Sequence, residues 1–236
     1  MTSFLSAEWR KLAMVNYAID PAVLQPFIPY KTELDTWNNT CYVSLVGFMF
    51  LQTKLLGIKI PGHVNFEEVN LRFYVRYKHG IQWKRGVVFI KEIVPKTMIA
   101  WVANNVYGEN YEALAMRHHW TIDTGKQAVS YGWKKQQWQE MVINASSTPE
   151  DITAGSEAEF ITEHYWGYTQ RGRSKTGEYE VQHPRWQTYP VTDYSINVDF
   201  ELSYGPVFSF LNNMQPRSVL LAEGSEIKVL KGRTIR

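Results

Sequence analysis

Hydrophobic and polar residues alternate along Asn65–Tyr77, which reads NFEEVNLRFYVRY. Apolar side chains occupy positions 69, 71, 73 and 75, and between them stand Asn70, Arg72, Tyr74 and Arg76. A period of two is typical of a β-strand, because successive side chains of a strand point to opposite faces. One face of this strand is therefore apolar, and the other carries an amide, a phenol and two guanidinium groups. Such a strand often lines a binding site.

Extended patterns recur along most of the chain. Cys41–Phe50 and Gly86–Val94 are partly apolar on both faces, which predicts strands that are covered on both sides. Met98–Asn104 is predicted to pair with Gly86–Val94 across a turn at Pro95. Further extended runs continue toward the C-terminus and include Val207–Phe210. Together these patterns predict about a dozen strands.

Signals for helices are few and short. Asp20 and Pro21 form a helix start, since Pro suits the first helical position and Asp caps it, so Pro21–Phe27 is predicted to be helical. Tyr107–Met116 is a second predicted helix, and a capping box precedes a third, Glu157–His164. We therefore expect a mainly β fold with short helices, arranged as a closed or nearly closed barrel. No linker rich in Pro, Gly or Ser divides the chain, so residues 1–236 are expected to form a single domain.

Composition narrows the possible partners. Hydrophobic residues make up 44% of the chain and charged residues 20%, which is typical of a globular protein. A net charge of +2 gives no reason to expect a nucleic-acid partner. No run approaches the ~18 apolar residues of a membrane span. The single cysteine, Cys41, and a charged N-terminal segment lead us to expect a cytoplasmic protein, and a homo-oligomer is compatible with the sequence.

Seven separated segments, in order, resemble the YqjF-like family of uncharacterised conserved proteins. They are FLSAEWRKLAMVNY, YVSLVGFMFL, NFEEVNLRFYVR, GVVFIKEIVPK, YGENYEAL, EHYWGYT and YEVQHPRW. That family is similar in fold to acetoacetate decarboxylase, so the resemblance implies an acetoacetate-decarboxylase-like β-barrel with a pocket for a small acid. No cofactor is implied.

The resemblance also bears on the reaction. Acetoacetate decarboxylase forms a Schiff base through a lysine that is followed by a second lysine, after a Gly-x-Pro turn. Gly108–Glu112 stands at about this place and reads GENYE, so that Tyr111 and Glu112 replace the two lysines. Lys96 follows a proline too, but a lysine at a turn between strands is expected to be solvated. We therefore do not expect imine chemistry.

Candidate catalytic residues lie in the predicted second helix. Glu109, Tyr111 and Glu112 could move a proton, with Tyr107 and Asn110 as ligand-binding neighbours. The structural alternative is that the carboxylates only stabilise the positive end of the helix.

Two further groups are candidate ligand-binding residues. Glu68, Asn70 and Arg72, together with Glu67, could clamp an anion, because guanidinium forms a natural fork for a carboxylate. A structural Glu–Arg network is the alternative. His183 and Arg185 flank a proline at a strand-to-turn corner and could approach a ligand, although packing of this corner against Trp186 explains it as well.

Other chemistries lack support in the sequence. His118 and His119 are adjacent, so on a strand they point to opposite faces, and we expect no metal site. Dinucleotide, nucleotide and serine-hydrolase motifs are absent.

The sequence leaves two functions open. In the first, the barrel holds a small organic acid or carbonyl compound and acts on it without Schiff-base chemistry. In the second, it is a non-catalytic ligand-binding or structural protein. An enzyme should have a carboxylate or histidine with a displaced pKa in the same cavity as Arg72, and a simple binder should not.

Overall fold

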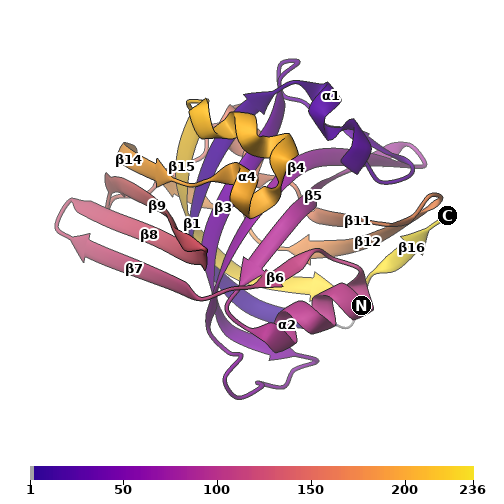
Figure 1. Ribbon diagram of the computed structural model, residues 1–236, viewed down its shortest axis with the longest axis horizontal. Helices are drawn as coiled ribbons and strands as arrows, with labels where there is room; N and C mark the ends of the chain where they lie inside the picture. Colours follow the sequence, from indigo (N-terminus) through magenta and orange to yellow (C-terminus); the bar gives the residue numbers. More distant parts are fainter. Residues whose placement is uncertain (1–2) are drawn as a thin grey trace.

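Most of the strands belong to one large sheet. The computed structural model describes residues 3–236, and the side chains of residues 106 and 107 lie outside this description. The strands of the large sheet are β1 (Ser3–Ile19), β2 (Thr32–Leu34), β3 (Cys41–Leu55), β4 (Phe66–His79), β5 (Gln82–Val94), β6 (Tyr111–Ala113), β10 (Glu150–Asp151), β11 (Trp166–Gly172), β12 (Lys175–Gln182), β13 (Gln187–Tyr189), β15 (Ser218–Leu230) and β16 (Arg233–Ile235). Figure 1 shows these strands curving around a common interior.

This sheet closes on itself. Seven strands form a ring in the order β15, β1, β3, β4, β5, β11 and β12, and β12 returns to β15. Two short joints complete it: β5 and β11 pair in parallel at Gly86 and Val87, and β12 pairs with β15 at Val181 and Gln182. The remaining neighbours in the ring are antiparallel and long. The predicted mainly β fold with short helices is confirmed.

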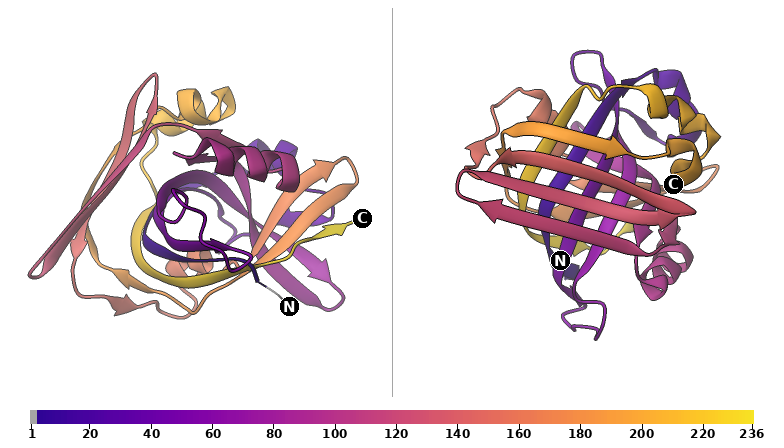
Figure 2. Two further views of the ribbon diagram at one scale, coloured as in Figure 1. Left: turned by 90° about the horizontal axis from the view of Figure 1, so that it is seen from below. Right: turned by 60° about the vertical axis from the view of Figure 1, so that its left-hand side comes forward.

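A second sheet of four strands lies beside the ring. It contains β7 (Met116–Asp123), β8 (Lys126–Lys135), β9 (Gln137–Ser146) and β14 (Val191–Asn197). Figure 2 shows its strands crossing those of β1 and β3 at a steep angle. The alternation along β4 explains how both sheets meet: its odd-numbered apolar residues, such as Leu71 and Phe73, share one buried cluster with Tyr131 and Met141 of the second sheet.

The two faces of the ring have different roles. Strand β3 is buried on both faces from Cys41 to Phe50, as its two-sided apolar pattern predicted. Its outer face packs against the second sheet, whereas Val46, Phe48 and Phe50 belong to a separate cluster. Phe48 and Phe50 also line a cavity. The interior of the ring is therefore only partly filled by side chains.

Two of the three predicted helices are present. Helix α1 (Pro21–Leu24) continues into the 3-10 turn η1 (Gln25–Phe27), and Asp20 caps it through a 2.8 Å bond from the backbone N–H of Ala22. Helix α3 (Glu157–Thr162) begins after its Ser156 cap. The pattern around Pro21 and Ser156 predicted these starts because the caps satisfy backbone N–H groups locally.

The helix predicted over Tyr107–Met116 is wrong, and so is the strand predicted over Met98–Asn104. Helix α2 (Thr97–Val102) and the π-helical turn η2 (Ala103–Tyr107) come first, and β6 then pairs in parallel with β5. Residues 98, 99, 102 and 103 line the cavity, so the lining positions recur after four residues, as on one face of a helix, and not at every second residue as on a strand. Pairing with β5 decides the conformation of β6.

Near the C-terminus, two short helices replace a predicted strand. Helix α4 (Phe200–Tyr204) and the 3-10 helix η3 (Pro206–Asn213) cover the outer face of the ring, so the strand prediction for Val207–Phe210 is wrong. Pro206 begins η3 directly after Gly205, and Phe208 packs into the core cluster shared by the two sheets. In the part of the chain that the structure describes, no helix is long and apolar enough to cross a membrane.

Candidate functional site

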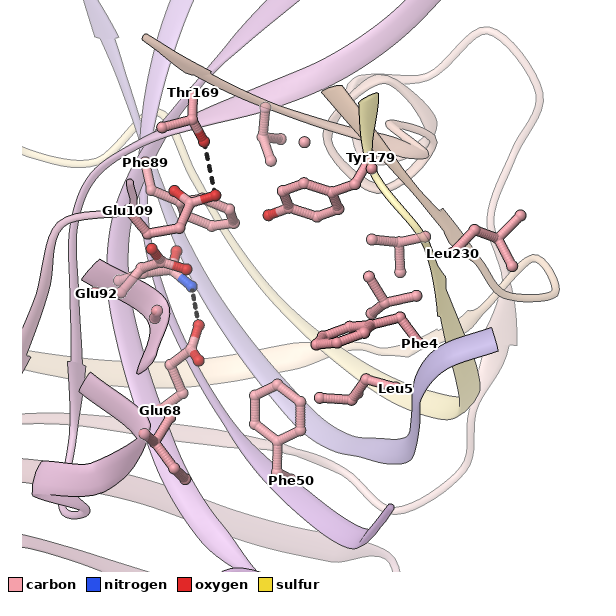
Figure 3. A pocket seen from close by; sticks show the side chains of 18 of the residues that line it. Phe4, Leu5, Phe50, Glu68, Phe89, Glu92, Glu109, Thr169, Tyr179 and Leu230 are labelled. Atoms are coloured by element: carbon pink, nitrogen blue, oxygen red, sulfur yellow. Dashed lines mark hydrogen bonds between the residues drawn. The ribbon is translucent and has the colours of Figure 1, made fainter. Parts of the chain in front are cut away.

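A cavity of about 860 Å³ occupies the interior of the ring. Its wall is built from β1, β3, β4, β5, β11, β12 and β15, and from α2 at one end. Figure 3 shows carboxyl groups on one side and apolar side chains such as Phe4, Leu5 and Phe50 on the other. The polar face of β4, which carries Arg72, is the face that lines this cavity.

The polar side of the cavity begins with Glu68 on β4. Alternate residues of a strand share a face, so Glu68, Asn70 and Arg72 all point into the cavity, and all three are buried. The Asn70 amide donates a hydrogen bond of 3.0 Å to Oε1 of Glu68, and the Tyr111 hydroxyl donates one of 3.2 Å to Oε2. Burial raises the pKa of Glu68 to about 7, although both hydrogen bonds and Arg72 oppose the shift.

Glu92 on β5 stands next to this group. It lies opposite Asn70 in the β4–β5 register, so both side chains share the face toward the cavity. Its Oε2 atom is buried without a hydrogen-bond partner among the described residues. Burial raises the pKa of Glu92 well above its usual range, and the charges of Glu109 and Glu68 add to the shift. Burial therefore favours the protonated form of this carboxyl, which can donate a hydrogen bond.

Glu109 approaches from the segment between η2 and β6. Gly108 has a φ of 70° in the left-handed region, and it ends η2 and turns the chain toward the ring. The Thr169 hydroxyl donates a hydrogen bond of 2.6 Å to Oε1 of Glu109 (Figure 3). Burial raises the pKa of Glu109 to about 7. We call Glu68, Glu92 and Glu109 the carboxyl cluster.

Two phenols accompany the carboxyl cluster. Burial, reinforced by the nearby carboxylates, raises the pKa of Tyr111 and of Tyr179 well above the usual value. Both side chains are neutral hydroxyl groups at any ordinary pH. Tyr111 already donates to Glu68, and the Tyr179 ring points across the cavity toward the carboxyl cluster (Figure 3). The site thus combines carboxyl groups that can exchange protons with hydroxyl groups that cannot easily lose theirs.

Arg72 supplies a positive charge on the same wall. Its Nη2 atom lies 4.0 Å from the Met14 sulfur, a weak acceptor, and its Nε has no hydrogen-bond partner within the described part of the chain. A buried guanidinium with unused donors is suited to an anionic or carbonyl oxygen. Arg72 therefore lines the cavity with a donor that no described residue satisfies.

His164 also lines the cavity, and the sequence reasoning did not select it as a ligand-binding residue. Its Nε2 lies 3.1 Å from Oδ2 of Asp35, and Arg85 binds the same Asp35 oxygen at 2.6 Å. Burial lowers the pKa of His164 to about 4, so the imidazole is neutral at pH 7. For Asp35, burial is outweighed by these hydrogen bonds, which lower its pKa to about 2. This arrangement fixes the ring beside the cavity.

Several other predicted residues lie elsewhere. Glu112 does not line the cavity; it pairs with Lys91 at 3.1 Å and with Lys135. Although burial acts in the opposite direction, these lysines lower the pKa of Glu112. The side-chain amide of Asn110 donates a hydrogen bond of 2.6 Å to the carbonyl oxygen of Ile90, and Asn110 does not line the cavity. The side chain of Tyr107 lies outside the described residues.

The two candidate residues that flank Pro184, His183 and Arg185, lie in different environments. His183 lines the cavity and stacks on Trp186, with ring centroids 4.2 Å apart and an angle of 18°. Arg185 points outward and forms an ion pair of 2.7 Å with Glu159. Glu67, next to Glu68, faces outward too and contacts His118 at 2.6 Å.

The sequence reasoning missed Glu92, Thr169 and Tyr179 as site residues. A signal existed for Glu92, because it interrupts the apolar run GVVFIKEIV, where a lone carboxylate needs a special environment. Thr169 and Tyr179 carried no comparable signal, since they lie on ordinary half-polar strands. Their placement depends on the joint between β5 and β11.

Metal-binding groups and lysines can be checked among the described residues that line the cavity. Among the described residues, no group of three or more His, Cys, Asp or Glu side chains could hold a metal ion. Lys231 is the one lysine among the described lining residues, and it is exposed. Lys96 precedes α2 and does not line the cavity.

Known structures share this architecture. Acetoacetate decarboxylase from Legionella pneumophila aligns with a TM-score of 0.66 at 11% identity, covering 98% of this chain and 87% of the decarboxylase. The enduracididine biosynthesis enzyme MppR aligns with a TM-score of 0.70 at 12% identity, covering 100% of this chain and 89% of MppR. Identities this low show the fold alone. The predicted acetoacetate-decarboxylase-like fold is confirmed.

Sequence comparison identifies the family. The uncharacterized protein YqjF of Bacillus subtilis (strain 168) is 28% identical over 186 residues, which cover 75% of this chain and 72% of YqjF. A family model described as "Uncharacterized conserved protein", DUF2071, matches residues 6–226. Because this model spans nearly the whole chain, the protein belongs to the DUF2071 family of uncharacterized conserved proteins, in agreement with the YqjF-like motifs in its sequence.

Proposed function

We propose that the cavity binds a small organic acid or carbonyl compound and catalyses proton transfer next to its carbonyl group, without forming an imine. One observation carries this proposal: Glu68 and Glu109 have pKa values raised to about 7 and line the same cavity. A group with a pKa near the operating pH is both a competent base and a competent acid. A cavity that only binds has no need of such groups.

The roles follow from the protonation states. Glu109 or Glu68, when ionised, removes a proton from the carbon next to the carbonyl. The Tyr111 hydroxyl, once it turns from Glu68 to the ligand, and the protonated form of Glu92 are hydrogen-bond donors that stabilise the negative charge developing on the carbonyl oxygen. Arg72 holds the carboxylate of an acidic ligand through its unused donors. The same carboxyl then returns the proton, so the protein ends the cycle unchanged.

The choice of ligand class draws on the fold neighbours. MppR has been described in complex with pyruvate and with the condensation product of pyruvate and imidazole 4-carboxaldehyde. Both compounds contain the carbonyl and carboxylate oxygens that Arg72 and Tyr111 could bind here. Among the described residues, the exposed Lys231 is the one lysine that lines the cavity, which supports a route without a Schiff base.

Hydrogen–deuterium exchange tests the proposal. Pyruvate and butanone in D2O exchange the protons beside their carbonyl groups, and NMR measures the rate. We expect the protein to accelerate this exchange at neutral pH, and Glu68→Gln and Glu109→Gln together to slow it by roughly 10²–10⁴-fold, because the amide cannot accept the proton. Glu140→Gln, which changes a carboxylate paired with Arg117 on the second sheet, is the matched control and should leave the rate unchanged.

Three results would contradict parts of the proposal. No acceleration for any carbonyl compound, combined with measurable binding, would favour the non-catalytic ligand-binding protein. Equal rates in the double variant and the control would remove the two carboxyl groups from the mechanism. A lysine adduct after borohydride reduction in the presence of acetoacetate would show that imine chemistry operates, with Lys96 and Lys231 as the residues to check first.

A further inference from the structure

The carboxyl cluster occupies only one side of the cavity. Other parts of the wall are apolar: Leu5 and Phe50 are seen in Figure 3, and Phe66 lines the cavity next to Phe50, its partner in the β3–β4 register. Phe50 and Phe66 are stacked on each other with their ring centroids 4.7 Å apart, so they form one aromatic cluster in this wall. Nothing in proton transfer at a carbonyl group uses this surface. Its area is available to a part of the ligand that does not react.

The apolar wall continues to the outside. Leu56 and Ile60, in the connection between β3 and β4, and Met98 on α2 line the cavity, and they are exposed by 68%, 37% and 58%. The β3–β4 connection and α2 lie at the same end of the molecule (Figure 1). Large apolar side chains in water are unfavourable unless something covers them, and side chains that are exposed and also line the cavity lie where it opens to solvent.

The size of the cavity also indicates a ligand larger than the reacting carbonyl group alone. Cavities of about 300–1,000 Å³ hold ligands of drug size, and this one is near the upper end at about 860 Å³. A ligand as small as pyruvate would contact the carboxyl cluster and leave the apolar half of the cavity without a partner. Oε2 of Glu92 and Nε of Arg72, two buried polar atoms without hydrogen bonds to described residues, lie on the carboxyl side, where a polar head would meet them.

We propose that the natural ligand is an amphiphile: a carbonyl compound whose head contacts the carboxyl cluster and whose unbranched or aromatic tail runs along Phe50 and Phe66 to the opening at Leu56 and Met98. The proposal rests on the proposed function, because it assigns the head of the ligand to the same carboxyl groups. It adds a class of substrate, long-tailed ketones or oxo acids in place of short ones.

A homologous series of methyl ketones tests the proposal. Binding of ketones with tails from ethyl to nonyl is measured by calorimetry and by the change in tryptophan fluorescence, since Trp9, Trp166 and Trp186 line the cavity. Burying one methylene group is favourable enough to lower Kd by roughly three- to fourfold. We expect this step for each added carbon until the tail reaches the solvent. Equal affinity across the series would overturn the proposal.

Two double variants test the path of the ligand's apolar tail through the opening. Leu56→Gln with Met98→Gln makes the opening polar, and we expect Kd to rise roughly tenfold for methyl nonyl ketone and to stay unchanged for butanone. Ile58→Gln with Trp101→Gln is the matched control, since these residues belong to the same connection and the same helix, are exposed by 68% and 64%, and do not line the cavity. Equal losses in both pairs would contradict the assigned path.

The two proposals fail in different ways. Exchange of butanone protons with no dependence of affinity on tail length would overturn the amphiphile and leave the proton transfer standing. Binding that depends on tail length, without exchange at any pH, would support the amphiphile as ligand and overturn proton transfer. Absence of binding for every ketone would overturn both.

Discussion

Glu68 is buried and Glu109 half-buried in a cavity where solvation by water is incomplete, and this raises the pKa of each to about 7. The shift has a thermodynamic consequence. An unfolded chain releases these protons near the usual value of 4.5, so between that pH and about 7 the folded protein binds more protons than the unfolded one. The free energy of unfolding must then fall as pH rises through this window.

Glu109→Gln isolates one of these contributions. Gln keeps an oxygen that accepts the Thr169 hydrogen bond but cannot ionise, so the variant lacks the penalty that the carboxylate brings at higher pH. We expect its free energy of unfolding, relative to the natural protein, to increase by roughly 1–3 kcal/mol between pH 5 and pH 8. Urea denaturation at both pH values measures the difference.

Comparing the variant with the natural protein cancels the titration of His164. His164, whose pKa is lowered to about 4, makes stability rise with pH between about 4 and 6.5, opposite to the effect of Glu109. Both proteins contain His164, so its contribution cancels in the difference, which reports Glu109 together with the effect of its charge on Glu68 and Glu92. A difference that stays constant from pH 5 to pH 8 would show that Glu109 ionises in the folded state as it does in water.

At the scale of elements, the joint between β5 and β11 determines which residues reach the cavity. Gly86 pairs with Trp166 there, and a Cβ at Gly86 would clash with the carbonyl oxygen of Trp166 and lie 2.6 Å from Cε2 of Tyr168. The first of these is backbone and cannot rotate away. Only glycine therefore allows the two strands to approach closely enough to close the ring on this side.

Gly86→Ala should open this joint. We expect a loss of roughly 2–4 kcal/mol in the free energy of unfolding, because β11 must shift and takes the Thr169 hydrogen bond to Glu109 with it. Gly80→Ala is the control: Gly80 has a φ of 62° but open space around it, so only backbone strain of about 1–2 kcal/mol applies. Equal losses in the two variants would mean that the close contact at Gly86 is unimportant.

The helices and strands also show which parts of the fold could be predicted from the sequence alone. Alternation along β4 predicted the strand and brought Glu68, Asn70 and Arg72 to one face, because the period of a strand is a local property. The segment Thr97–Ala113 was misread, since its conformation depends on pairing with β5 and on the Asn104 side chain, which bonds both backbone N–H and C=O of Tyr111. Such contacts between distant residues leave no local pattern.

Glu109 and Glu112 illustrate the same limit within the candidate site. Both were candidates because they share a short acidic segment, and the extended β6 sends them to different environments. Glu109 reaches Thr169 inside the ring, whereas Glu112 meets Lys91 and Lys135 outside it. A helix would have kept them on neighbouring faces. The correct division of this segment into turn and strand was therefore necessary to separate the two carboxylates.

For the whole molecule, the ring and the second sheet share one buried cluster. Tyr131 on β8 donates a 2.8 Å hydrogen bond to the carbonyl of Lys11 on β1, and Trp133 donates one of 3.3 Å to Ser203 on α4. Met141 on β9 packs directly against Gly47. A Cβ added to Gly47 would lie 2.5 Å from the methyl carbon of Met141. Among the described residues, every buried hydrophobic side chain of the second sheet belongs to this cluster, so we expect the sheet to unfold together with the ring.

This shared cluster predicts one cooperative unfolding transition for the chain as a single domain. Met141→Ala leaves a void between the two sheets and should lower the free energy of unfolding by about 2–5 kcal/mol. Pulsed hydrogen exchange in urea, read by mass spectrometry of peptides, reports on β8 and β9 separately from β3 and β4. We expect the urea midpoints of the two sets of peptides to coincide in the natural protein and to move together in the variant. If Met141→Ala instead separates them, with β8 and β9 losing protection before the ring does, the second sheet is an independent unit and the single-domain prediction fails.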